Sequence, residues 1–242
     1  MNLREKFEKK FVKGILSLID DIYEGKPPYN KKELARWKKV FFERADRINL
    51  SEKEKIEFYD LFLNQYIKEE FLHLTSFSLY DNELHGFVTQ INEKISKTYT
   101  TFDQVKYKEE ETGIKNVKII KSVVKGMRSD FSYNKERSRN EYISFKKEDS
   151  EDLTFLMEFS YGSLSMEVSV RIGFLKYFED SDEPFFYIAD IQSFFPIIES
   201  PFNSYGSYKY YSSQELEEKT VKCIEYFNKI YPYFEKIVKN AF

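Results

Sequence analysis

Cysteine, proline and glycine are scarce in this sequence, and it contains no long apolar run. The single cysteine, Cys223, excludes an internal disulfide framework and favours a reducing compartment. No stretch approaches the ~20 apolar residues of a membrane span, and charge interrupts residues 1–30 too often for a signal peptide. The 6 prolines and 8 glycines, set against 18% aromatic residues, exclude a disordered chain. We therefore expect a globular cytoplasmic protein with a substantial core.

The common catalytic motifs are missing as well. The chain has no Gly-rich phosphate loop, no G-x-S-x-G, no H-E-x-x-H and no C-x-x-C. The two histidines, His73 and His85, have no motif around them, and Cys223 falls on the apolar stripe of a predicted helix. We expect no enzymatic activity, no cofactor and no bound metal.

The first part of the chain has helical periodicity. Apolar residues recur at spacings of three and four and predict an amphipathic first helix: Leu3, Phe7, Phe11, Ile15, Ile19 and Ile22. Asn30 with Glu33, and Ser51 with Glu54, form capping-box patterns that begin two more helices. A fourth helix is expected from about residue 83. We assign residues 1–97 to a helical region.

Residues 98–242 have a mixed pattern. A short helix is predicted to end at Gly126, and a long one begins at Ser212, where Glu215 completes another capping box. Between them lie strand candidates at residues 130–133, 142–146, 153–161, 164–174 and 185–194. The sequence predicts an α+β fold, in which an N-terminal helical region precedes an antiparallel sheet flanked by helices, with a long C-terminal helix.

The stretch from Leu153 to Phe174 predicts a β-hairpin. Its apolar residues are odd-numbered up to Tyr161 and even-numbered from Leu164. Because apolar residues are odd-numbered in one strand and even-numbered in the other, the strands share an apolar face only if the numbers of facing residues sum to an odd value. A two-residue turn at Gly162 and Ser163 meets this condition and places Tyr161 opposite Leu164.

The same register places Glu158 opposite Glu167 on the polar face, where like charges repel. One interpretation makes them, with Asp190 of the next strand, the metal or acid–base site of a nuclease or phosphoesterase. The other is a solvated face on which Arg171 softens the repulsion.

Charge is distributed unevenly, although the net charge is only −3. Residues 125–147 contain seven Lys or Arg against three acids, a balance of +4, with aromatic residues between them. Basic side chains bind phosphate and rings stack on bases, so this segment predicts nucleic-acid binding as an alternative function. The candidate residues are Arg128, Lys135, Arg137, Arg139, Lys146 and Lys147.

Between residues 148 and 200 the balance reverses, because twelve acids stand against two basic residues, giving −10. The acids are concentrated in "FEDSDEP", from Phe178 to Pro184. Such a segment attracts a basic partner, and Phe178, Phe185 and Phe186 could anchor it. Simple solubilisation is the alternative. The partner-binding candidates are Glu158, Glu167, Arg171, Asp180, Asp182 and Glu183.

The chain ends with a capped helix that contains a proline, "YYSSQELEEKTVKCIEYFNKIYPYFEKIV". A helix, an antiparallel sheet with a Ser-rich polar face and an acidic loop precede it. Over residues 115–240 this order resembles small α/β immunity-type domains of bacteria, which neutralise toxins by binding. The resemblance implies a non-catalytic module of a bacterial conflict or defence system, whose basic partner is a toxin or a nucleic-acid enzyme.

Overall fold

The computed structural model describes residues 2–47, 50–61, 67–72, 75–77, 116–139, 141–162, 167–191 and 208–242. The chain divides into two compact units: residues 1–11, 110–192 and 207–242 form unit 1, and residues 12–109 and 193–206 form unit 2. Helix α1 (Leu3–Tyr23) contributes residues to both. The expected boundary near residue 98, the helix expected from residue 83, and both histidines lie outside the described residues.

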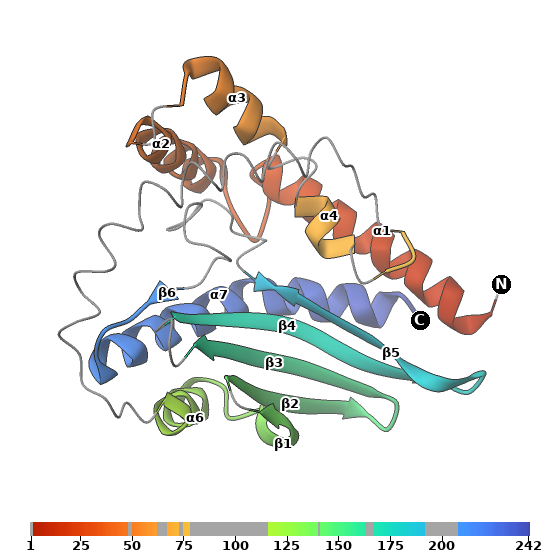
Figure 1. Cartoon of the computed structure of the whole chain (residues 1–242). Coiled ribbons are helices and arrows are strands. Elements are labelled where there is room, and N and C mark those ends of the chain that lie inside the picture. Colours follow the sequence, from red (N-terminus) through yellow and green to blue (C-terminus); the bar gives the residue numbers. More distant parts are fainter. Residues whose placement is uncertain are drawn as a thin grey trace. The chain divides into compact units, whose positions relative to one another are not determined.

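Unit 1 has the predicted α+β architecture. Its antiparallel sheet has the order β1 (Ser132–Arg139), β2 (Tyr142–Ser150), β3 (Leu153–Gly162), β4 (Glu167–Phe178) and β5 (Ser181–Asp190), and the short β6 (Tyr208–Lys209) pairs with β4. Helix α6 (Asn116–Met127) precedes the sheet and packs against α7 (Ser213–Asn240), which runs along one sheet face (Figure 1). The fold class is therefore confirmed.

The core of unit 1 lies between the sheet and its helices. Phe155 of β3 and Phe174 of β4 point toward α7, where their rings contact Tyr231 and Phe234. Cys223 is buried on the same side of α7, as its apolar stripe predicts. Burial raises the pKa of its thiol, so Cys223 is an inert core residue.

Phe7 of α1 connects the first turns of the chain to this core. Its ring centroid lies 5.8 Å from those of Phe174 and Phe185, 5.4 Å from Phe178 and 5.3 Å from Phe242. These rings come from α1, from both strands of the β4–β5 hairpin and from the residues after α7. Aromatic pairs at such separations add to the stabilisation that burial itself provides.

The predicted capping boxes form. In α2 (Lys31–Arg47), Glu33 N donates to Asn30 Oδ1 at 3.0 Å, and Asn30 N donates to Glu33 Oε2 at 3.1 Å. At the start of α7, Glu215 N donates to Ser212 Oγ at 3.1 Å, whereas Glu215 Oε2 accepts from Tyr211 N. These bonds satisfy backbone N–H groups that have no partner within the helix.

A further capping box at the start of α1 is missing from the prediction. Glu5 N donates to Asn2 Oδ1 at 2.8 Å, and Asn2 N donates to Glu5 Oε2 at 3.1 Å. Asn followed three residues later by Glu is the signal that would have revealed it.

Unit 2 contains the rest of α1, α2, α3 (Glu52–Leu61) and α4 (Ile67–Leu72). The box predicted at α3 forms, because Ser51 N donates to Glu54 Oε2 at 2.8 Å. Lys55 of α3 bonds Asp46 of α2, and Lys68 of α4 pairs with Asp20 of α1 at 2.7 Å. None of the described helices is long and apolar enough to cross a bilayer.

The β3–β4 hairpin keeps the predicted apolar face but has a different register. Tyr161 pairs with Val168 and Gly162 with Glu167, so residues 163–166 connect the strands in place of the predicted two-residue turn. The predicted pairing of Tyr161 with Leu164 is wrong. Slipping a strand by four residues leaves every side chain on its original face, so alternation alone cannot distinguish the two registers.

We predict that Phe7→Ala destabilises the protein by about 3–5 kcal/mol, because it leaves a cavity among rings that come from three parts of the chain. Val117→Ala is the control, since Val117 is 37% exposed and its truncation should change stability by no more than about 0.5 kcal/mol. Urea denaturation followed by far-UV circular dichroism measures both. Equal losses for the two variants would contradict the central role of Phe7.

Candidate binding surfaces

The sheet face opposite α7 carries a row of polar side chains, one from each of five strands. Cross-strand pairing aligns them from β1 to β5 in the order Asn134, Ser144, Glu158, Arg171 and Asp190. Arg171 Nε lies 3.5 Å from Asp190 Oδ1, so charge alternates in sign across β3, β4 and β5. Glu158 therefore faces an arginine and not the predicted glutamate, and this arrangement replaces repulsion with attraction.

A β-bulge in β1 changes which face its side chains occupy. Tyr133 pairs with Phe145 on the face toward α7. Beyond the irregularity, Arg139 pairs with Tyr142 on the outer face. A bulge interrupts the alternation of a strand, and it therefore places Arg137 and Arg139 on the outer face.

Ser138 supplies the hydrogen bonds that the bulge removes from the ladder. Its hydroxyl donates to Asn134 O at 2.6 Å and accepts from Ser144 N at 3.0 Å. A buried backbone donor in this position would otherwise lack a partner. The side chain thus keeps β1 attached to β2 where regular pairing fails.

Arg137 crosses the outer face. Its Nε donates to Glu158 Oε1 at 2.9 Å, and its guanidinium carbon lies 4.5 Å from the ring centroid of Phe186 on β5. Strands β1 and β5 are four strand spacings apart, about 19 Å on a flat sheet, which is farther than an arginine side chain reaches. The sheet is therefore curled, and Arg137 covers Glu158, whose side chain is 8% exposed.

The three carboxylates of the predicted metal site are not brought together. Arg171 stands between Glu158 and Asp190, and Glu167 pairs with Gly162 on one side and Lys209 on the other. Among the described residues, no group of three His, Cys, Asp or Glu side chains could hold a metal ion.

The basic segment is divided between the two faces of the sheet. Arg128 and Lys147 lie on the face toward α7, whereas Arg137, Arg139 and Lys146 lie on the outer face. Lys146 pairs with Glu148 at 2.6 Å. The six predicted nucleic-acid contacts therefore do not form one surface, and their role in binding stays a prediction.

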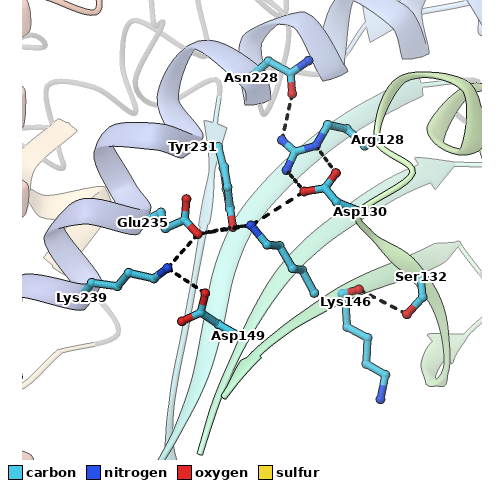
Figure 2. Close-up of polar contacts among 10 residues, drawn as sticks. Arg128, Asp130, Ser132, Lys146, Asp149, Asn228, Tyr231, Glu235 and Lys239 are labelled. Atoms are coloured by element: carbon cyan, nitrogen blue, oxygen red, sulfur yellow. Dashed lines mark hydrogen bonds and ion pairs between the residues drawn. The ribbon is translucent and has the colours of Figure 1, made fainter. Parts of the chain in front are cut away.

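Arg128 and Lys147 belong to a polar network that fastens α7 to β2 and to the segment between α6 and β1. Figure 2 shows this network, with Arg128, Asp130 and Glu235 labelled. The Arg128 guanidinium donates twice to Asp130 at 2.8 Å and once to Asn228 Oδ1 at 2.9 Å, and it lies over the Tyr231 ring. Lys147 Nζ donates to Tyr231 Oη at 3.1 Å and to Glu235 Oε1 at 3.2 Å. These cations are already neutralised within the fold.

The network changes the acidity of its carboxyl groups. Hydrogen bonds from Arg128 lower the pKa of Asp130. Burial opposes ionisation of Glu235, but hydrogen bonds from Lys147 and Lys239 outweigh it and lower the pKa. Lys239 also pairs with Asp149 at 2.7 Å. Ionised carboxylates are therefore part of the contact between α7 and the sheet.

The acidic loop is the turn between β4 and β5. Glu179, Asp182 and Glu183 are exposed, whereas Asp180 accepts a hydrogen bond from Leu3 N at 2.9 Å and so caps α1. Phe178 and Phe185 both pack on Phe7, so of the three predicted aromatic anchors Phe185 is buried in the core and Phe178 is partly buried. We name the acidic turn as residues 179–183.

Three exposed apolar side chains near this turn were not predicted as partner anchors, although Leu3 was predicted as part of the apolar stripe of the first helix. Leu3, Tyr177 and Phe242 are each 51% exposed. Leu3 is joined to the turn through Asp180, and Phe242 lies beside Phe7 and beneath the Lys176 ammonium. The proximity of Leu3 and Phe242 to the hairpin gave no signal in the sequence, because only the fold brings them there.

We predict that Arg137→Met costs about 2–3 kcal/mol, because it leaves a buried carboxylate without its closest cation. Glu158→Gln should cost less, about 1 kcal/mol, since Arg137 is 33% exposed and can turn toward water. Arg139→Met, at an exposed position of the same strand, is the control. Urea denaturation measures all three, and a larger loss for Glu158→Gln than for Arg137→Met would refute the asymmetry.

Acid should weaken the contact between α7 and the sheet. Because the pKa values of Asp130 and Glu235 are lowered in the folded state, their contribution is complete above the unfolded values near about 4 and disappears as the pH falls through the folded values. The urea midpoint should therefore decrease more steeply on acidification for the wild type than for Asp130→Asn. Glu136→Gln, at an exposed position of β1, should keep the wild-type slope.

Comparison with protein family models, with curated proteins and with solved structures finds no match to this chain. The resemblance to immunity-type domains and the function that it implies stay predictions.

Proposed function

We propose that this chain is a non-catalytic binding module that recognises a basic protein partner with the acidic turn. The observation that carries the proposal is the exposure of Glu179, Asp182 and Glu183. Within the described parts of the chain, no ion pair involves these three carboxylates. An uncompensated cluster of charge attracts a cationic surface and accelerates its association at low ionic strength.

The rigidity of the turn supports this proposal. Ser181 Oγ donates to Glu183 O at 2.9 Å, and Asp180 is held by the first amide of α1. The strands on either side are packed on Phe7 through Phe178 and Phe185. A preorganised surface loses little conformational entropy when it binds.

The exposed apolar residues around the turn complete the interface that we propose. Leu3, Tyr177 and Phe242 provide contact area beside the charges, and aromatic side chains often dominate the energy of binding. Charge would then attract the partner, and these side chains would retain it. They take the role first assigned to Phe178 and Phe185.

The partner class follows from the expected resemblance. We infer an accessory or immunity-type factor of a bacterial conflict system, acting in the cytoplasm on a toxin or nucleic-acid enzyme with a basic surface. Nucleic-acid enzymes carry such surfaces because they bind phosphate.

The proposal predicts that reversing Glu179, Asp182 and Glu183 to Lys slows association with a basic partner recovered from the native host. The association rate should fall by about tenfold or more, which is the size of effect expected for electrostatic steering. Asp180 is left unchanged because it caps α1. The matched control reverses three other exposed carboxylates: Glu151, Glu217 and Glu225.

Association rates are measured across a salt series by surface plasmon resonance. The control variant has the same net charge as the test variant, so it measures the effect of net charge alone on the association rate. Its association rate should stay close to that of the wild type. If both variants associate as the wild type does, with the same salt dependence, the acidic turn only increases solubility.

A further inference from the structure

Helix α6 presents a stripe of lysines that the expected nucleic-acid site did not include as a group. Lys118, Lys121 and Lys125 follow one another at spacings of three and four residues, which places them on one side of the helix. The other side buries Ile120 and Val124. No acidic residue occurs in α6 to compensate the three charges.

Strand β1 extends this stripe. Lys121 Nζ lies 3.2 Å from the ring centroid of Tyr133, which is 40% exposed. Lys135, two residues further along the strand, is exposed as well. We define the α6–β1 surface as Lys118, Lys121, Lys125, Tyr133 and Lys135. All five residues belong to unit 1.

These lysines differ from the other cations of the basic segment. Arg128, Arg137 and Lys147 each pair with a carboxylate. For the four lysines of the α6–β1 surface, the described residues provide no ion pair. Glu136 is the one acidic residue of β1. The positive charge at this corner is therefore not neutralised by the fold.

We propose that the α6–β1 surface binds single-stranded nucleic acid through its phosphate backbone. Lysine is depleted in protein–protein interfaces but is a principal phosphate ligand, so four lysines favour nucleic acid over an acidic protein. Tyr133 adds an exposed ring, on which a base can stack, and stacking favours a single strand over a duplex. The surface contains no Arg, Asn or Gln to read base edges, and binding should not depend on sequence.

This inference goes beyond the proposed function and does not depend on it, because the two surfaces share no residue. Contact of three or four lysines with phosphates predicts a slope of log affinity against log salt of about −2 to −3 for a single strand. Binding should therefore be measurable at low salt and should weaken by about 25- to 125-fold over a fivefold rise in salt.

Fluorescence anisotropy of labelled oligothymidylate and oligouridylate of about 20 nucleotides tests the proposal, with a duplex of the same length for comparison. In the test variant, Lys118, Lys121 and Lys125 are changed to Gln. Its matched control changes Lys6, Lys9 and Lys13 to Gln, because these exposed lysines of α1 have the same helical spacing. Circular dichroism confirms that both variants fold.

We expect the Lys118/Lys121/Lys125 variant to lose at least tenfold in affinity for the single strand and to show a shallower salt slope, whereas the α1 control binds as the wild type does. Tyr133→Leu should weaken single-strand binding by about fivefold or more and leave the salt slope unchanged. The reversal variant of the acidic turn should bind no more weakly than the wild type.

Three results would overturn the proposal. The first is the absence of wild-type binding at low salt. The second is equal loss in the test and α1 control variants. The third is that the wild type binds duplex more tightly than the single strand, or that polyglutamate displaces the single strand, while Tyr133→Leu has no effect on binding. That last result would assign the surface to duplex or to acidic protein.

Discussion

The packing of Phe7 against the β4–β5 hairpin is the contact on which unit 1 depends. Its neighbours come from the start of α1, from two strands and from the end of the chain. The part of α1 that ends at Phe11 therefore belongs to a unit whose other parts are far away in sequence. The hairpin turn is also held by the first turn of α1, because Asp180 accepts a hydrogen bond from Leu3 N. The surface that we propose for binding and the core beneath it are one structure.

Local sequence signals predicted the elements well. Helix starts at Asn30, Ser51 and Ser212 were visible because a capping residue and an acid three positions later form bonds within one turn. Strand alternation predicted the apolar face of the β3–β4 hairpin for a similar reason, since each side chain reports only its own orientation. Signals of this kind do not depend on the rest of the fold.

Long-range pairings were not predictable in the same way. The period-two pattern accepts any register that differs by an even number of residues, so it could not exclude Glu167 as the partner of Glu158. The bulge in β1 was equally hidden, because it depends on a hydroxyl of Ser138 that bonds two strands at once. Lys146 and Lys147 are neighbours in β2 and point to opposite faces, and the bulge places Arg137 and Arg139 on the outer face. The sequence could not distinguish the lysines of α6, which have no ion pair among the described residues, from Arg128, Arg137 and Lys147, because the fold alone decides which cations meet a carboxylate.

The bulge has a second consequence, which concerns the edge of the sheet. Strand β1 stands at the end of the strand order, where unpaired backbone groups can recruit a strand of another molecule. Its irregular backbone offers no long, flat edge, and a lysine and a glutamate in the middle of the strand would have to be buried by an incoming strand. Natural sheets use these two devices against edge-to-edge aggregation. The serine that closes the bulge thus helps to keep separate copies of the protein from joining into a continuous sheet.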